Sequence, residues 1–260
     1  MTRPDRIIEP LSPDGLEAQL QAIGAQRYHR HHPFHKRLHS GQCSLDEVRA
    51  WALNRYCYQR AIPRKDATIL ARLEVLEHRR VWRQRIVDHD GELGDAPEGG
   101  LRRWLALTDA LGFERSFVTS LQGVLPAVQY ASEAYVNFVA TQPIIDAIAS
   151  SLTEMFSPQT IEERVNGMLR HYDFIAPDTL RYFEHRLTEA PRDVEFALDY
   201  VKTHATAADT QNQVCDALRF KCDMLWSQLD AVHYAYVLAT PPPGAWHPGT
   251  SAALINRMSQ

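Results

Sequence analysis

Apolar side chains recur every three or four residues along most of the chain, which is the spacing of one buried face of an α-helix. No stretch shows a convincing alternation with a period of two, as a β-strand would, and no internal repeat is found. The pattern therefore predicts a single all-α bundle. The expected helices span residues 13–24, 44–62, 74–89, 99–111, 114–123, 127–140, 143–156, 158–170, 178–190, 192–207 and 210–238.

Capping residues and prolines set the expected helix ends. Ser44 and Glu47 form a capping box that opens the second helix, and Pro63 is expected to end it. Gly24 is expected to end the first helix, and Pro191 to separate two helices near the C-terminus. No linker within the helical region is long enough to divide it into two domains. The expected organisation is a tail over 1–10, one helical domain over 11–240 and a Pro/Gly-rich tail over 241–260.

Composition narrows the class of protein. The chain carries 28 Lys and Arg against 32 Asp and Glu, a net charge of −4 that argues against a nucleic-acid binder. The N-terminus has no apolar core of signal-peptide length, and no run approaches the roughly 18 apolar residues of a membrane span. The four cysteines show no Cys-x-x-Cys spacing and are expected to be reduced thiols. The prediction is a cytoplasmic protein without membrane association.

Cations on the apolar faces of the predicted helices change this picture, because burying an unpaired cation is costly. Five helices each place a cation or a histidine on the buried face, and Glu154 is the clearest carboxylate to pair with them. Such an excess suits a polyanionic ligand, since guanidinium groups bind carboxylates at two points. Salt-bridged packing without a ligand is the alternative. The inward polar residues are Arg55, Gln59, Arg85, His89, Arg164, Arg186 and Lys221.

Histidines gather between residues 28 and 39, but their spacing does not predict a metal site. No His-Glu-x-x-His motif occurs, the paired Glu-x-x-His motifs of a di-iron bundle are missing, and Pro33 interrupts the helical spacing. Phosphate-binding loops and nucleophile elbows are also missing from the sequence. His89, flanked by Asp88 and Asp90, can exchange a proton near neutral pH. A histidine favoured by the dipole at a helix C-terminus is the alternative.

Several segments make a longer pattern when they are taken in order. They are YHRHHPFH (28–35), WALNRYCYQRAIPRKDA (51–67), WRQRIVDHDG (82–91), SSLTEMFSP (150–158), APRDVEFAL (190–198) and RFKCDMLWSQLDA (219–231). Over about residues 11–247 the chain resembles the PqqC family of pyrroloquinoline-quinone synthases. The resemblance implies a seven-helix bundle of the heme-oxygenase type with short extra helices, assembled as a homodimer.

The same resemblance implies the last step of pyrroloquinoline quinone (PQQ) biosynthesis. This step is the ring closure and eight-electron oxidation of a quinoline-tricarboxylate precursor, AHQQ. Molecular oxygen is the implied oxidant, and PQQ and hydrogen peroxide are the implied products, with no metal or organic redox cofactor. The three carboxylates of the product would account for the surplus of inward cations.

Carried over position by position, the resemblance implies oxygen handling and proton transfer for His89, Tyr182 and Arg186. Contacts with the substrate are implied for Tyr28, His29, Arg55, Gln59, Lys65, Arg85, Tyr135, Glu154, Arg164 and Lys221. One position departs from the family, because this chain has Ile161 where some members carry a histidine. A proton step assigned to that histidine has no counterpart here.

Three other functions stay open at this point. A heme-oxygenase-like enzyme would use heme or a di-iron centre. A TenA-like or thiaminase-like hydrolase would need a cysteine nucleophile, and Cys57 and Cys222 flank predicted pocket positions. A non-catalytic carrier of the quinone would bind the product without consuming oxygen.

Overall fold

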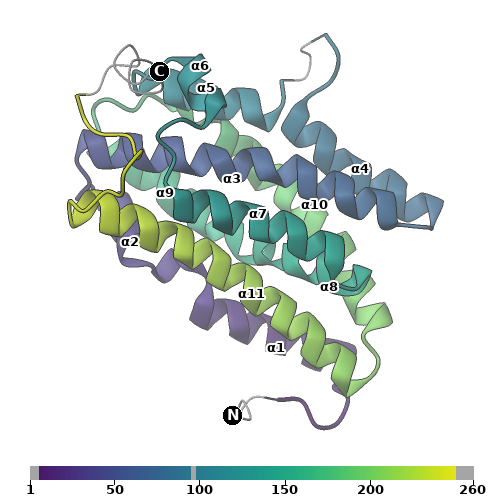
Figure 1. Ribbon diagram of the computed structural model, residues 1–260. Coiled ribbons are helices and arrows are strands. Elements are labelled where there is room, and N and C mark those ends of the chain that lie inside the picture. The colour runs from purple at the N-terminus through teal and green to yellow at the C-terminus, as the bar shows by residue number, and fades with distance from the viewer. Residues whose placement is uncertain (1–5, 95–97, 250–260) are drawn as a thin grey trace.

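The computed structural model describes residues 6–94 and 98–249, which form helices joined by short connections and no β-strand (Figure 1). Seven helices in this part of the chain are at least 15 residues long, and four α-helices are shorter. The prediction of an all-α bundle with short extra helices is confirmed. The long helices are α1 (Pro13–Arg27), α3 (Leu45–Arg72), α4 (Leu76–Asp90), α7 (Pro126–Thr141), α9 (Ser157–His171), α10 (Arg181–His204) and α11 (Ala208–Val232).

Shorter elements join and cap these helices. The short α-helices are α2 (Pro33–His39), α5 (Gly100–Ala110), α6 (Arg115–Ser120) and α8 (Ile144–Ala149). The 3-10 helices are η1 (His29–His31), η2 (Ser150–Phe156) and η3 (Pro177–Leu180), and a π-helical turn, η4 (His233–Val237), follows α11.

The long helices pack into a bundle whose interior is divided into two apolar clusters. In Figure 1, α3, α7 and α11 lie side by side, with α1 packed against α11. Trp51, Trp104 and Phe183 belong to one buried cluster, and Leu16 and Leu218 to the other. Residues of both clusters line the cavity described below, so the cavity lies where the two clusters meet.

α3 continues through Pro63, so the expected end of this helix was wrong. Proline has no N–H to donate to the carbonyl oxygen of Gln59, and such a position costs about 3 kcal/mol in a helix interior. Pro63 is buried with most of the residues around it, and this packing outweighs the local penalty. As a result, Arg55, Gln59 and Lys65 belong to one continuous helix.

α10 likewise continues through Pro191, where two separate helices were predicted. Ala190 and Asp193 on either side of the proline are buried, so packing again overrides the local signal. The uninterrupted helix places Asp193 two turns after Arg186, where the two side chains can form an ion pair.

Gly24 does not end α1, which runs on to Arg27. A Cβ atom at Gly24 would lie 1.9 Å from Cζ of Phe156 in η2. The glycine is therefore required for close packing between α1 and η2, a reason that the local sequence does not reveal.

Three further segments differ from the prediction. Pro33 opens α2 rather than breaking a helix, because it occupies the first turn, where no N–H is needed, and the His32 side chain accepts a hydrogen bond from the Phe34 N–H. The helix expected over 143–156 is α8 followed by the 3-10 helix η2. The last predicted helix is α-helical to Val232 and then widens into η4.

The part of the C-terminal tail that the structure describes is held against the bundle. Trp246 is buried, its N–H donates to the carbonyl oxygen of Gly123 at 2.9 Å, and its own carbonyl accepts from the Tyr236 hydroxyl at 2.9 Å. Residues 1–5 and 250–260 of the two predicted tails lie outside the described residues. None of the described helices has the length and apolar character needed to cross a membrane.

Candidate active site

A cavity lies between α3, α9, α10, α11 and η2, with further residues from α4, α7 and the start of η1. Its walls enclose about 720 Å³ of space free of protein atoms, counted out to the solvent at its mouth. All but one of the predicted site residues line it. They are Tyr28, His29, Arg55, Gln59, Lys65, His89, Tyr135, Glu154, Arg164, Tyr182, Arg186 and Lys221. The structure thus brings these residues together, while their roles stay predictions.

Three cations of the wall, Arg55, Arg164 and Lys221, have no carboxylate within ion-pair distance among the described residues. Arg55 lies over the ring of Tyr58 at 4.1 Å, and Arg164 over the ring of Phe183 at 5.2 Å. Burial and the nearby Arg55 lower the pKa of Arg164 to about 10, which leaves it charged at neutral pH. Aromatic faces therefore compensate this positive charge in place of acids.

Lys221 is the most confined of these cations. Its Nζ donates a hydrogen bond to the Tyr58 hydroxyl at 2.7 Å and lies 3.2 Å from the centre of the Tyr135 ring. Burial, followed by the positive charges of Lys65 and Arg55, lowers the pKa of Lys221 well below 10.5. An anion in the cavity would relieve this repulsion and favour the charged form of Lys221.

The other cations of the site are paired with acids. Lys65 Nζ lies 2.6 Å from Asp66 Oδ1 and donates a hydrogen bond to Ser151 Oγ at 3.1 Å. Arg85 Nε donates to the same Asp66 oxygen at 3.2 Å, and its Nη1 lies 3.2 Å from Asp193 Oδ2. Arg85 is the one predicted site residue that does not line the cavity, because it stands behind the wall in this ion-pair network.

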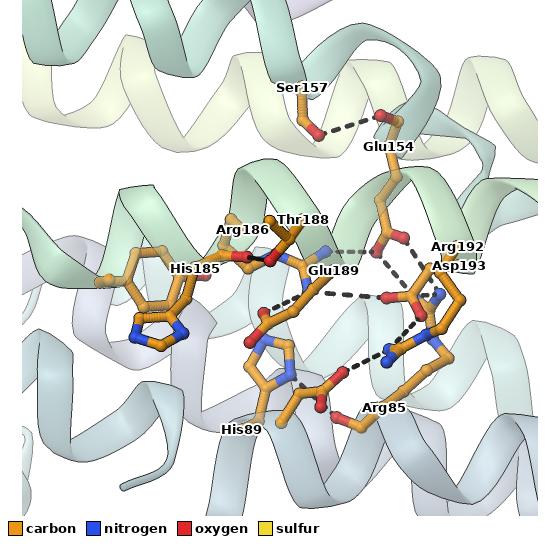
Figure 2. Close-up of polar contacts among 12 residues, drawn as sticks. Arg85, His89, Glu154, Ser157, His185, Arg186, Thr188, Glu189, Arg192 and Asp193 are labelled. Carbon is orange, nitrogen blue, oxygen red and sulfur yellow. Dashed lines mark hydrogen bonds and ion pairs between the residues drawn. The ribbon is translucent and has the colours of Figure 1, made fainter. Parts of the chain in front are cut away.

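Glu154, which lines the cavity, interacts with both Arg85 and Arg186 (Figure 2). Arg85 donates to both of its oxygens, with Nη2 at 2.6 Å from Oε1 and Nη1 at 3.0 Å from Oε2, and Arg186 Nη2 lies 3.6 Å from Oε1. Burial would raise the pKa of Glu154, but Arg85, Arg186 and Lys65 outweigh it and lower the pKa to about 2. Glu154 is therefore ionised and fixed in place.

The prediction that Glu154 is the clearest inward carboxylate was incomplete. Arg186 Nη1 also lies 3.1 Å from Glu189 Oε2 and 3.5 Å from Asp193 Oδ2. Asp66 and Asp193 were missed because each follows a proline that was expected to interrupt the helix, Pro63 in α3 and Pro191 in α10. Once α3 and α10 run on, both acids face the cations of the site.

His89 is held in one tautomer. Its Nδ1 lies 3.0 Å from the carbonyl oxygen of Arg85, which can only accept, so Nδ1 carries the proton. Its Nε2 is buried and has no hydrogen-bond partner in the part of the chain that the structure describes. Burial and the positive charge of Arg186 lower the pKa of His89 to about 4. At neutral pH, His89 is therefore a neutral imidazole with a free acceptor at Nε2.

Tyr182 and Arg186 lie one turn apart on α10, and both face the cavity. The Tyr182 hydroxyl donates to Gln59 Oε1 at 2.7 Å. Burial raises the pKa of Tyr182, so this side chain is a neutral phenol. Gln59, predicted as a ligand contact, also orients this hydroxyl.

Further lining residues were missed by the sequence pattern. Among them, Tyr58 and Ser151 each accept a hydrogen bond from a lysine of the site. Ile161, already named as a departure from the family, also lines the cavity and places an apolar surface where a histidine would be needed for a further proton step. No periodic signal marks a tyrosine or serine as a partner of a lysine on another helix. The remaining missed lining residues are Ile62, Thr153, Ser157, Thr160, Phe183 and Leu225.

The cysteines do not line the cavity, and all four are buried free thiols. Burial raises the pKa of Cys222 to about 12 and also raises that of Cys57, so both stay protonated and are poor nucleophiles. The geometry gives no support to a cysteine-based hydrolase. Within residues 6–94 and 98–249, no group of three or more His, Cys, Asp or Glu side chains is arranged to hold a metal ion.

Comparison with known proteins gives consistent matches over most of the chain. Residues 17–231 match the model of the TENA/THI-4/PQQC family. A relative from Gluconobacter oxydans, named pyrroloquinoline-quinone synthase, is 58% identical over 92% of this chain and 99% of its own length. A relative of the same name from Xanthomonas oryzae pv. oryzae is 57% identical over 94% of this chain and 98% of its own.

A longer relative is the bifunctional coenzyme PQQ synthesis protein C/D of Methylorubrum extorquens, which is 57% identical over 95% of this chain. This chain spans 66% of the length of that protein.

Solved structures share the fold at low identity. A domain of unknown function with a heme oxygenase-like fold from Shewanella denitrificans has a TM-score of 0.67 and 13% identity, over 90% of this chain and 96% of its own. A TenA homolog from Pseudomonas syringae pv. tomato has a TM-score of 0.65 and 13% identity, over 88% and 97%. At this identity the likeness establishes the heme-oxygenase-like fold and nothing of the activity.

Proposed function

The chain belongs to the TENA/THI-4/PQQC family, and we propose that it is a pyrroloquinoline-quinone synthase. It catalyses the final step of PQQ biosynthesis, the ring closure and eight-electron oxidation of the tricarboxylate AHQQ. Molecular oxygen is the oxidant, and PQQ and hydrogen peroxide are released. The proposed reaction uses no metal or organic redox cofactor.

One structural observation carries the proposal beyond the names of relatives. Arg55, Arg164 and Lys221 line the cavity without a carboxylate partner among the described residues, while the other cations of the site, Lys65, Arg85 and Arg186, are paired. Buried charges are normally paired, so this surplus calls for an anionic ligand. A substrate and a product with three carboxylates supply that charge.

The paired cations have a different task in this proposal. Asp66, Glu154 and Asp193 hold Arg85 in place, and Glu154 also reaches Arg186. This network fixes the wall of the cavity before the ligand enters, so that little binding energy is lost in ordering side chains. Arg85 acts through Glu154 rather than by touching the substrate.

His89 is the proposed general base. Its unpartnered Nε2 can take a proton from the bound precursor, and its Nδ1–H is anchored on the carbonyl oxygen of Arg85. Loss of a proton makes the substrate electron-rich enough to reduce oxygen. The protein then has to position the substrate, exclude water and move protons.

Tyr182 and Arg186 are the proposed oxygen-side residues. The neutral hydroxyl of Tyr182 and the guanidinium of Arg186 line the same wall and can stabilise negative charge as oxygen is reduced towards peroxide. Glu154, Glu189 and Asp193 form ion pairs with Arg186 and keep it in place.

The proposal includes a cytoplasmic homodimer that works without nucleic acid or membrane. The four free cysteines suit a reducing compartment. Sedimentation of the purified chain tests the dimer, and fractionation of cells that produce it tests the location.

The proposed function is tested by incubating the purified chain with AHQQ, first without oxygen and then in air. Anaerobic mixing should perturb the absorption spectrum of the precursor, because the ligand is desolvated and bound by cations. Admission of air should give the spectrum of PQQ together with hydrogen peroxide. A chain that binds PQQ but consumes no oxygen with AHQQ is a carrier, and a chain that binds neither compound has another function.

A further inference from the structure

His35, in the first turn of α2, is a buried histidine that does not line the cavity. Its Nδ1 lies 3.0 Å from His29 Nδ1 and 3.1 Å from the carbonyl oxygen of His29. Its Nε2 lies 3.5 Å from Nη2 of Arg164, and its ring stacks on that of His39 at 5.3 Å between centroids. His35 therefore connects two residues of the cavity wall, His29 and Arg164.

These contacts permit only one arrangement of protons. Arginine can only donate and a carbonyl oxygen can only accept, so His35 Nε2 must be the acceptor and His35 Nδ1–H the donor. That N–H is shared between the His29 carbonyl oxygen and His29 Nδ1. The opposite arrangement would bring an N–H of His35 against Arg164 and a lone pair against the carbonyl oxygen of His29.

The imidazole rings of His29 and His35 are both neutral, so each carries a single N–H and its tautomer can be assigned. Burial, aided by Arg55 and Arg164, lowers the pKa of His29 well below 6.5. Burial, aided by His29 and Arg164, does the same for His35. A neutral imidazole has one N–H, so His29, whose Nδ1 accepts from His35, carries its proton on Nε2.

We propose that His35 is a positioning residue that fixes His29 as the Nε2–H tautomer, so that His29 offers the cavity a hydrogen-bond donor. The other histidine of the wall, His89, is fixed in the opposite sense, with its proton on Nδ1 and a free acceptor at Nε2. The cavity thus contains two neutral imidazoles of opposite polarity, one that gives a hydrogen bond and one that can take a proton.

The local fold explains how His35 reaches this position. The side chain of His32 accepts the Phe34 N–H at 3.0 Å and caps α2, and Pro33 fills the first helical position. This start directs the first turn of α2 back over η1, where His29 lies. The role of the pair in turnover rests on the proposed function, whereas the tautomer of His29 does not.

The tautomers are measured on the full-length chain with ¹⁵N-labelled histidine, by long-range proton–nitrogen correlation spectra. The proposal predicts a protonated Nε2 and an unprotonated Nδ1 for His29 in the wild-type protein. His35→Phe keeps an aromatic ring on His39 but removes the donor, so His29 should change its tautomer or sample both. His35→Asn is the matched control, since its amide N–H can take the place of Nδ1–H and preserve the wild-type tautomer of His29.

The functional readout is the affinity for PQQ, measured by absorption titration. His35→Phe should raise the Kd about 10-fold, the effect of one misdirected hydrogen bond. His35→Asn should keep most of the wild-type affinity. If His35→Phe does not fold, His35→Gln replaces it, because its amide cannot reach the Nδ1 position.

A protonated Nδ1 on His29 in the wild-type protein would overturn the assignment. So would a tautomer of His29 that stays the same when the donor of His35 is removed. If the tautomers are as proposed but the protein neither binds PQQ nor oxidises AHQQ, the proposed function fails while the role of His35 stands.

Discussion

Glu154 accepts a hydrogen bond on each of its oxygens from Arg85, at 2.6 and 3.0 Å, and so links a residue of the cavity wall to one that lies behind it. The Arg85 side chain of this pair is almost completely buried. Removing one partner of a buried ion pair is far more costly than removing a surface pair, because the other charge is left without compensation.

Glu154→Gln should therefore lower the free energy of unfolding by about 3 kcal/mol at neutral pH. The pKa of Glu154 is lowered from 4.5 to about 2, so this contribution is complete above pH 4.5 and is lost as the pH falls towards 2. Urea unfolding at several pH values measures both effects.

Glu163→Gln is the matched control, because Glu163 pairs with Arg30 at 2.9 Å on the surface. It should change the free energy of unfolding by less than about 1 kcal/mol. Equal losses for the two variants would contradict the assignment of Glu154 to a buried network.

Asp146 in α8 should destabilise the folded protein at neutral pH. Its Oδ1 is buried without a hydrogen-bond partner among the described residues, and burial, with help from Asp216, raises its pKa from 3.8 to about 6. A raised carboxyl pKa means that stability is greatest below pH 3.8 and is lost as the pH rises through about 6.

Asp146→Asn should therefore raise the melting temperature at pH 7, with a gain of roughly 1–2 kcal/mol in the free energy of unfolding. The gain should vanish below about pH 4, where Asp146 is protonated in the folded and unfolded states alike. Asp209→Asn, at an exposed position, should leave the melting temperature and the free energy of unfolding near those of the wild-type protein. A gain that does not depend on pH would show that ionisation of Asp146 is not its cause.

His89→Asn should reduce kcat by about 10²- to 10⁴-fold, the range for loss of a general base. Asparagine can still donate to the carbonyl oxygen of Arg85, so the affinity for PQQ should change little. His185→Asn on the exposed face of α10 should behave as wild type. A wild-type rate in His89→Asn would remove His89 from the proton step.

The pH dependence of the rate gives an independent check on His89. With a pKa of about 4, His89 is already unprotonated at pH 5, and its base form is lost only as the pH falls through about 4. Between about pH 5 and about pH 7, kcat/KM, which reports groups of the free enzyme, should therefore show no inflection from this group, whereas an ordinary histidine would titrate there. An inflection near pH 6.5 that disappears in His89→Asn would contradict a depressed pKa.

Lys221 should gain a proton when PQQ binds. Its pKa in the free protein lies well below 10.5 because of burial and of Lys65 and Arg55, and a bound carboxylate would raise it again. Titration calorimetry at several pH values, in buffers of different ionisation enthalpy, should show proton uptake of up to about one per site. Lys221→Gln should abolish this uptake and raise the Kd for PQQ by roughly 10- to 100-fold.

Lys202→Gln is the control for Lys221→Gln, because Lys202 pairs with Asp14 and Glu17 on the surface. It should leave both the affinity and the proton uptake unchanged. Equal proton uptake in the wild-type protein and in Lys221→Gln would place the proton on another group.

The all-α bundle was predictable because its signal is local and repeated, namely apolar spacing and capping residues such as Ser44 with Glu47. The wrong helix ends, at Pro63 and Pro191, fall where burial by distant helices overrides a local breaking signal. Gly24 is a similar case, since its reason is the ring of Phe156 on another element. Tertiary packing of this kind leaves no periodic mark in the sequence.

The lining of the cavity was predictable, Arg85 apart, through the family resemblance, and its surplus of cations through their positions on apolar faces, while the roles of these residues stay predictions. The ion-pair partners Asp66 and Asp193 were not, because they lie beyond the two prolines. The link from His35 to His29 was also invisible, since the proton on an imidazole depends on three-dimensional contacts.

The central claim is that this chain oxidises AHQQ to PQQ with oxygen alone, inside the cavity lined by Arg55, Arg164 and Lys221. It is tested most directly by repeated turnover of AHQQ in air by the purified chain after exhaustive chelation, with the metal content measured on the same sample. The claim predicts many molecules of PQQ per chain, with peroxide released and metal far below one atom per chain. No PQQ from AHQQ, or an activity that chelation removes and added metal restores, would contradict it.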